Sequence, residues 1–414
     1  MPEHARGIEM KRTHIRSILL TGIMAAAMMA GCAGRNGGNE ISASQAINEN
    51  GGSPPSAAQS SNGGNGSQSS AAQSSNGGNG GQSAAVQSSS ENSGTENMRD
   101  PSGREEERGN TVDSGSRSLS GTVPDELEYI PDEYRYPAEQ EGTLERLTYQ
   151  TWESFSYEDH TQELTKEAWV YLPYGYSEEK KYNVFYLSHG GWSNETTIMG
   201  TDEDPHTFKY VIDHAIQDGQ IQPLIIVLPT YNNTSGSDSG SYSLALQLTD
   251  QFHNELLNDL IPAVEGKYST YAEDTTPEGI AASRDHRGFG GFSMGSVNTW
   301  CTFRYCLDYF RYFLPISGSY STDGGYMAEL VRGSGHTWDD FFIFSASGTD
   351  DFAYSAFKRQ IMAMGEVEDG IFRFADNEAD GNLAFLEREG YTHDGMASDE
   401  YTYNGLRFFW NGSE

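Results

Sequence analysis

The segment Arg287-Gly288-Phe289-Gly290-Gly291-Phe292-Ser293-Met294-Gly295-Ser296 decides the fold, because it holds a G-x-S-x-G match from Gly291 to Gly295. In a nucleophile elbow of this pattern, the serine sits on a sharp turn from a strand into a helix, and small residues on either side let the two elements approach closely. Upstream lies an apolar run with glycines, and downstream the apolar residues indicate a helix leading to Tyr309 and Phe310. A chance match, in which the glycines only form a turn, is the alternative.

Short apolar segments alternate with helical ones around this elbow. We expect strands at Leu144 to Trp152, Lys166 to Leu172, Tyr182 to Ser188, Pro223 to Pro229, Tyr312 to Gly318 and Phe341 to Gly348. Helices are expected at Pro205 to Gln217 and at Ser243 to Tyr268. The first two strands have the composition of an antiparallel pair at a sheet edge. The alternation predicts an α/β protein: a mostly parallel central sheet with helices on both faces and functional residues at the strands' carboxyl ends.

Composition divides the 414 residues into three parts. Residues 1–31 have the features of an export signal, residues 32–125 are rich in Ser, Gly, Asn and Gln, and residues 126–414 hold most of the aromatic residues. The last part is long enough for one domain with a substantial core. The net charge of −34 argues against nucleic acid or an anionic membrane surface as a partner.

The amino-terminal part resembles a bacterial lipoprotein signal peptide. A basic segment from Met10 to Arg16 precedes the apolar run Ile18 to Ala30, which is too short to span a membrane. The run ends in Met29-Ala30-Gly31-Cys32, similar to a lipobox with methionine in the usual place of leucine. This implies cleavage before Cys32, lipid on its sulfur, and an exported protein anchored at the extracellular face of a bacterial cell membrane. An ordinary signal peptide with a coincidental cysteine is the alternative.

The second part contains an internal duplication. The sequence AAQSSNGGNG occurs at Ala57 to Gly66 and again at Ala71 to Gly80. Such a segment cannot bury enough apolar surface to offset the entropy lost on ordering. We therefore expect a disordered tether between the anchor and the folded domain.

The chain has only three cysteines. Besides Cys32, these are Cys301 and Cys306, both expected on the helix after the elbow at a spacing that places their side chains on different faces. We expect two buried thiols and no disulfide. No spacing typical of metal ligands occurs, so neither a metal nor another cofactor is expected.

A serine hydroxyl becomes a useful nucleophile only when an imidazole takes its proton and a carboxylate fixes the tautomer of that imidazole. In α/β-hydrolases these groups follow one another along the chain in the order Ser, acid, His. Only His336 and His393 follow Ser293. For His336 the acid would be Asp308 or Asp323, and neither comes directly after a predicted strand.

For His393 the acid has two candidates. Asp350 and Asp351 directly follow the predicted strand that ends at Gly348, where the acid of such a triad belongs. Spacing alone does not separate the two aspartates. By itself His393 fits a surface loop equally well, but together with the elbow and the acid it becomes the expected base.

The tetrahedral intermediate of ester hydrolysis needs two backbone N–H donors for its oxyanion. One is expected from Met294, which follows the nucleophile at the start of a helix. The other is expected from Gly191 in His189-Gly190-Gly191, because this loop directly follows an early strand. A plain glycine turn is the alternative for this loop.

Several motifs together resemble carbohydrate esterase family 1, and within it the feruloyl esterase domains of clostridial xylanases. The motifs are His189-Gly190-Gly191, Gly290 to Gly295, Cys306 to Tyr309 with Tyr312 to Gly318, Gly348 to Tyr354, and Tyr391-Thr392-His393. The resemblance covers about residues 144–410 and implies an α/β-hydrolase fold. It implies Ser293 as nucleophile, Asp351 as acid, His393 as base, and the N–H groups of Gly191 and Met294 as the oxyanion hole.

The chain departs from this family where substrates are selected. Related members carry tryptophan after the Ser-Gly turn and after the histidine, whereas this chain has Ser319-Tyr320 and Asp394 there. An aromatic acid such as ferulate needs a flat apolar wall, which Trp192 or Tyr320 would supply as a substrate contact.

The resemblance implies a serine esterase that releases feruloyl groups from plant cell-wall xylan through an acyl-serine intermediate. The departures leave an acetyl-xylan esterase, or another carbohydrate deacetylase, as the alternative within the same class. A surface glycan-binding lipoprotein with a vestigial site is the alternative from another class.

Overall fold

The structure, a computed structural model, describes residues 121–411. The predicted signal peptide, the lipidation site at Cys32 and nearly all of the predicted tether lie outside these residues. Packing begins early in the described part, because Val123, Leu127 and Ile130 are buried. The N–H of Val123 also donates to the carbonyl of Asp376 over 2.6 Å. Within residues 121–411 no helix is long and apolar enough to cross a bilayer.

An eight-stranded sheet in the order β1-β2-β4-β3-β5-β6-β7-β8 forms the centre of this part. The strands are β1 Thr143–Trp152, β2 Glu163–Leu172, β3 Asn183–Ser188, β4 Leu224–Leu228, β5 Arg287–Phe292, β6 Tyr312–Ile316, β7 Phe342–Gly348 and β8 Leu383–Arg388. β1 and β2 pair antiparallel at one edge, and every pair from β4 through β8 is parallel. The predicted mostly parallel sheet with an antiparallel edge pair is confirmed, and β8 is a strand that the sequence analysis missed.

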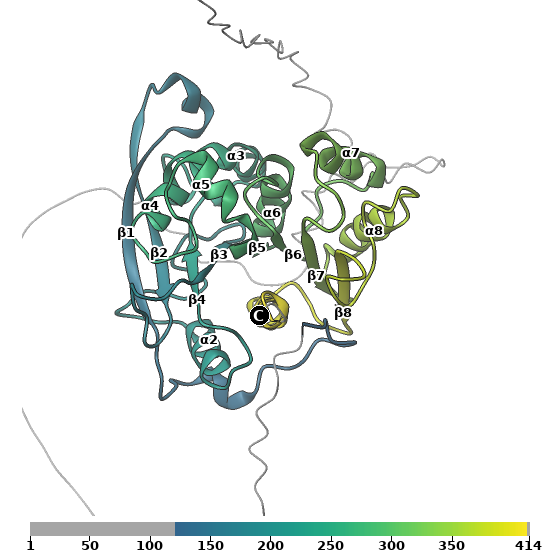
Figure 1. Ribbon diagram of the computed structural model, residues 1–414, viewed down its shortest axis with the longest axis horizontal. Coiled ribbons are helices and arrows are strands. Elements are labelled where there is room, and N and C mark those ends of the chain that lie inside the picture. Colours follow the sequence, from purple (N-terminus) through teal and green to yellow (C-terminus); the bar gives the residue numbers. More distant parts are fainter. Residues whose placement is uncertain (1–120, 412–414) are drawn as a thin grey trace, which may run out of the picture. The chain divides into compact units, whose positions relative to one another are not determined.

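Helices cover both faces of the sheet (Figure 1). One face packs against α2 (Thr207–Gln217) and α9 (Gly395–Phe408). The other face packs against a larger group: α3 Tyr242–Glu255, α4 Ile261–Glu265, α5 Pro277–Ala282, α6 Met294–Tyr305, α7 Gly324–Ser334 and α8 Tyr354–Gly365. Two apolar cores therefore lie above and below the sheet, as predicted for an α/β fold.

The helix expected from Ser243 to Tyr268 is divided. α3 ends at Glu255, one π turn spans Leu256–Leu260, and α4 follows. Pro262 has no N–H to donate, and its ring would clash with a carbonyl of the preceding turn in a regular α-helix. The wider π turn accommodates it, and the apolar spacing survives because Leu256 and Leu260 remain fully buried.

The helix after the elbow is shorter than expected. α6 ends at Tyr305, so Cys306 caps the helix, and Tyr309 and Phe310 lie beyond it. Cys301 and Cys306 are nevertheless both buried and unpaired, as predicted. Burial raises the pKa of both thiols, so they belong to the core and not to a reactive site.

A buried ion pair fixes the amino end of β5. The Arg287 Nε lies 2.6 Å from Glu265 Oε1, and its Nη2 lies 2.8 Å from Oε2. Its Nη1 donates to the carbonyl oxygens of Ile280 and Tyr309. Because both ions are paired and hydrogen-bonded, their buried charges are tolerated. The ion pair anchors the first residue of β5, and the elbow lies at the other end of this strand.

Candidate active site

The elbow serine has an unusual backbone conformation. Ser293 has φ 61° and ψ −116°, and α6 starts at the next residue, Met294. A residue other than glycine in such a region costs about 1–3 kcal/mol and persists only where the surroundings enforce it. The turn therefore stores strain at the residue whose hydroxyl is the candidate nucleophile.

Close backbone contacts enforce this turn and explain the two flanking glycines. A Cβ on Gly291 would lie 2.5 Å from the carbonyl oxygen of Ser188 and 2.9 Å from the Cα of Gly295. A Cβ on Gly295 would lie 2.4 Å from the same oxygen and 2.9 Å from the carbonyl oxygen of His189. These neighbours are backbone atoms, which cannot rotate away. The end of β3, the end of β5 and the start of α6 therefore meet at one point.

The structure distinguishes between the two candidate acids, Asp350 and Asp351. Asp351 is buried, and its carboxylate oxygens Oδ1 and Oδ2 lie 2.9 and 2.8 Å from Nδ1 of His393. Nδ1–H donates to this carboxylate, which also accepts from the N–H of Ala353 over 2.7 Å. Asp350 is exposed. The carboxylate beside the imidazole is therefore that of Asp351.

The loop that carries His393 is joined to the end of β7. The N–H of Thr349 donates to the carbonyl of Arg388, and the N–H of Asp350 donates to the carbonyl of Tyr391 over 3.1 Å. A Cβ on Gly348 would lie only 2.1 Å from that Tyr391 oxygen. This packing brings the imidazole and the carboxylate together although they come from separate loops.

The imidazole of His393 lies between two aromatic rings. Its centroid is 4.3 Å from that of Phe292, the residue before the serine, and 4.2 Å from that of Phe352. The first contact places the imidazole at the elbow. No hydrogen bond joins Ser293 to this imidazole within residues 121–411. Such bonds often form only when substrate is bound.

Two backbone donors beside the serine are free to bind an oxyanion. A Cβ on Gly190 would lie 3.6 Å from the Cβ of Ser293, so the loop after β3 runs directly against the nucleophile. Among the described residues, the N–H groups of Gly191 and Met294 donate to no acceptor. The Met294 N–H also lies at the positive end of α6, which favours a negative charge there.

The two predicted substrate contacts have different surroundings. Trp192 follows the candidate oxyanion loop, is 73% exposed, and is held at φ 55° with its N–H donating to Ser239. Tyr320 is only partly exposed, and its hydroxyl accepts from Arg304 over 2.7 Å. Arg304 lies near the carboxyl end of α6, and the elbow lies at the other end of this helix. Both contacts remain predictions, and Trp192 has the more accessible ring.

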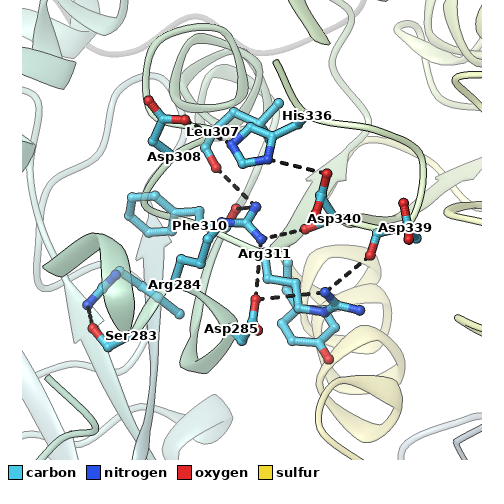
Figure 2. Close-up of polar contacts among 12 residues, drawn as sticks. Ser283, Arg284, Asp285, Leu307, Asp308, Phe310, Arg311, His336, Asp339 and Asp340 are labelled. Carbon is cyan, nitrogen blue, oxygen red and sulfur yellow. Dashed lines mark hydrogen bonds and ion pairs between the residues drawn. The ribbon is translucent and has the colours of Figure 1, made fainter. Parts of the chain in front are cut away.

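His336, the other candidate for the catalytic base, belongs to a separate group of polar residues (Figure 2). His336 contacts Asp308 through Nε2 over 2.8 Å, and its Nδ1 lies 3.5 Å from Asp340. Asp308 and Asp340 come just before β6 and β7, so this group lies at the amino ends of the strands. Ser293 follows the carboxyl end of β5, so it lies at the opposite ends of the strands. Across residues 121–411 no group of three or more His, Cys, Asp or Glu side chains is placed to hold a metal ion.

Sequence reasoning missed the segment that supports the candidate oxyanion loop. Thr230, Tyr231, Asn232 and Ser239 follow β4, and each hydrogen-bonds to a residue between His189 and Ser193. Common polar residues in a loop carry no pattern that reveals such contacts. The sequence offered only their position after a parallel strand, where sites gather.

Comparison with known proteins places the chain in a family. Residues 163–350 match the model of the family described as "Putative esterase". Endo-1,4-beta-xylanase Y of Acetivibrio thermocellus is 40% identical over 287 residues, which cover 68% of this chain and 24% of that protein. An endo-1,4-beta-xylanase/feruloyl esterase of Xylanibacter ruminicola is 29% identical over 170 residues, covering 39% of this chain and 20% of that protein. The chain thus spans about a quarter or less of the length of these curated relatives.

A solved structure is similar over nearly its whole length. The feruloyl esterase module from Clostridium thermocellum, as a serine-to-alanine variant complexed with sinapinate, is 39% identical with a TM-score of 0.61. The match covers 71% of this chain and 96% of that module. The chain therefore belongs to the esterase family, and the resemblance to carbohydrate esterase family 1 that its motifs indicated is confirmed.

The close contacts at Gly295 predict the effect of adding one methyl group. Gly295→Ala should lower the free energy of unfolding by about 3 kcal/mol or more, because the new Cβ would meet two backbone oxygens. Denaturant unfolding of both proteins measures this. Gly333→Ala is the matched control, since a Cβ there meets nothing within 4 Å. Equal stability of Gly295→Ala and the wild type would contradict the described packing.

Proposed function

We propose that the protein is a serine esterase that releases feruloyl groups from plant cell-wall xylan. One observation carries the proposal: a serine on a strained elbow directly follows Phe292, whose ring contacts the imidazole paired with Asp351, in a chain 39% identical to a feruloyl esterase module. The sinapinate bound to that module is itself a hydroxycinnamate. An acetyl group has no ring to contact, so the exposed ring of Trp192 gives no support to the acetyl alternative.

In this proposal Ser293, His393 and Asp351 form a catalytic triad. Nε2 of His393 accepts the proton of the Ser293 hydroxyl while Oγ attacks the ester carbonyl. Asp351 holds the Nδ1–H tautomer and stabilises the imidazolium that forms. The imidazolium then protonates the ester oxygen of the sugar as its bond to the acyl carbon breaks, so the sugar departs as an alcohol and a feruloyl-serine remains. A water molecule, deprotonated by the same imidazole, attacks this acyl group and releases ferulate.

The oxyanion of each tetrahedral intermediate is assigned to the N–H groups of Gly191 and Met294. Both donors are unengaged before substrate binds, so they need no rearrangement when the charge develops. The exposed ring of Trp192 follows directly after Gly191. It therefore supplies an apolar face beside the acyl group, as an aromatic acyl chain requires.

Export and lipid anchoring complete the proposal. They are supported by the sequence Met29-Ala30-Gly31-Cys32 after a short apolar run. A long polar tether would then let an anchored enzyme reach an insoluble polymer.

The anchor predicts a membrane-bound protein. When expressed in a bacterium fed a radiolabelled fatty acid, the wild type should carry label and Cys32→Ala should not. Labelling of both proteins, or of neither, would contradict anchoring at this cysteine.

The proposed substrate class predicts a preference among esters. The purified protein should hydrolyse methyl ferulate and release ferulate from feruloylated xylan, and acetylated xylan should be a much poorer substrate. Ser293→Ala should lose on the order of 10⁵-fold or more in kcat. Chromatography of released ferulate and acetate measures both. Inactivity of the wild type on all of these esters would overturn the proposal.

The assignment of the acid predicts different effects at neighbouring aspartates. Asp351→Asn should lower kcat by about 10³–10⁴-fold, because an amide does not hold the imidazole in its productive tautomer. Asp350→Asn, at an exposed position, should leave kcat within about twofold of the wild type. Steady-state kinetics on methyl ferulate distinguishes the two. Equal losses in both variants would contradict the assignment.

A further inference from the structure

We propose that His189 and Tyr231 are positioning residues for the oxyanion hole: they fix the carbonyl of Gly190 and thereby aim the N–H of Gly191 at the acyl oxygen. The proposal rests on the proposed esterase function. Both side chains are buried, with 1% exposure each. They therefore act through the backbone of the loop.

Two hydrogen bonds converge on one carbonyl oxygen. Nδ1 of His189 lies 2.7 Å from the Gly190 oxygen, and the Tyr231 hydroxyl donates to the same oxygen over 2.7 Å. A carbonyl oxygen only accepts, so Nδ1 must carry the proton. Two donors therefore hold the Gly190 carbonyl so that it points toward the buried side chains of His189 and Tyr231.

Peptide planarity transmits this restraint to the next N–H. The carbonyl of Gly190 and the N–H of Gly191 belong to one planar trans peptide unit, in which they point in opposite directions. Fixing the carbonyl toward the core therefore turns the N–H away from it, and that N–H has no acceptor among residues 121–411. Glycines on both sides leave this peptide free to rotate unless something else holds it. The two buried donors supply that hold.

The tautomer of His189 is fixed from its other side. Nε2 lies 2.8 Å from Oγ1 of Thr230, whose hydroxyl donates to it, so the proton remains on Nδ1. Burial lowers the pKa of His189 to about 4, and the nearby Lys166 ammonium adds to this effect. The ring is therefore neutral at neutral pH.

The support for this network extends into the core. The carbonyl of Thr230 accepts from the Lys166 ammonium over 2.7 Å, and that ammonium is paired with the buried Glu255. The imidazole of His189 also stacks on the ring of Tyr231, with centroids 4.4 Å apart. The donors to Gly190 are therefore rigid, as required of groups that orient a catalytic dipole.

Tyr231→Phe removes one donor and keeps the ring. We expect a roughly tenfold lower kcat on methyl ferulate with KM changed by less than about twofold, because the oxyanion forms only after substrate binds. The affinity for an aryl trifluoromethyl ketone, which forms an oxyanion on the nucleophilic serine, should fall by a similar factor. The affinity for ferulate, measured by competitive inhibition, should not change.

Tyr171→Phe is the matched control, because it also removes a buried tyrosine hydroxyl. This hydroxyl donates to Asp213 over 2.8 Å, on the face of the sheet that packs against α2. The Tyr171→Phe variant should have lower thermal stability and an unchanged kcat.

A second pair of variants tests whether Thr230 fixes the tautomer of His189. Thr230→Val should lower kcat several-fold, whereas Thr230→Ser, which retains the hydroxyl, should have the kcat of the wild type.

The outcomes separate this proposal from the proposed function. An active wild type with an equally active Tyr231→Phe and unchanged ketone affinity would overturn the positioning role and leave the esterase intact. Parallel losses of ketone and ferulate affinity would indicate a disturbed pocket and would also overturn it. A wild type that neither hydrolyses feruloyl esters nor binds the ketone would overturn both.

Discussion

The contact between the carbonyl oxygen of Ser188 and the two elbow glycines is the constraint on which the rest of the site depends. It requires hydrogen in place of Cβ at Gly291 and Gly295, and it brings β3, β5 and α6 to one point. Because β3 ends there, the loop that follows it lies against Ser293. Because α6 begins there, the N–H of Met294 lies next to Ser293 and is not engaged by an acceptor among residues 121–411. The strain at Ser293 is tolerated because the surrounding backbone leaves no room to relax.

The second half of the site is assembled by a different part of the sheet. β7 and β8 end in loops that hydrogen-bond to each other, and these loops carry Asp351 and His393. The ring of Phe292 then meets the imidazole and joins this half to the elbow. A parallel sheet makes this arrangement natural, because residues far apart in the chain leave the sheet along the same edge. Ester hydrolysis needs a nucleophile, a base and an oxyanion site together, and this edge can hold all three.

Much of this arrangement was predictable from the sequence, since the chemistry depends on local patterns. The elbow at Ser293 follows from two glycines and a strand-to-helix change, and the β1 and β2 edge pair follows from composition. The end of α6 and the π turn at Leu256–Leu260 were missed, because tertiary packing and Pro262 decide them. The choice between Asp350 and Asp351 required either family resemblance or coordinates. The support from Thr230 and Tyr231 gave no sequence signal, because hydrogen bonds between distant loop residues have no spacing rule.

The central claim is that the hydroxyl of Ser293 forms a covalent bond to the acyl group of an ester. Mass spectrometry of the protein, quenched in acid during turnover of a feruloyl ester and then digested, tests this claim directly. The account predicts a mass increase equal to one feruloyl group on the peptide that contains Ser293, and its disappearance as substrate is exhausted. Turnover with that peptide unmodified, or with the acyl group on another residue, would contradict the account.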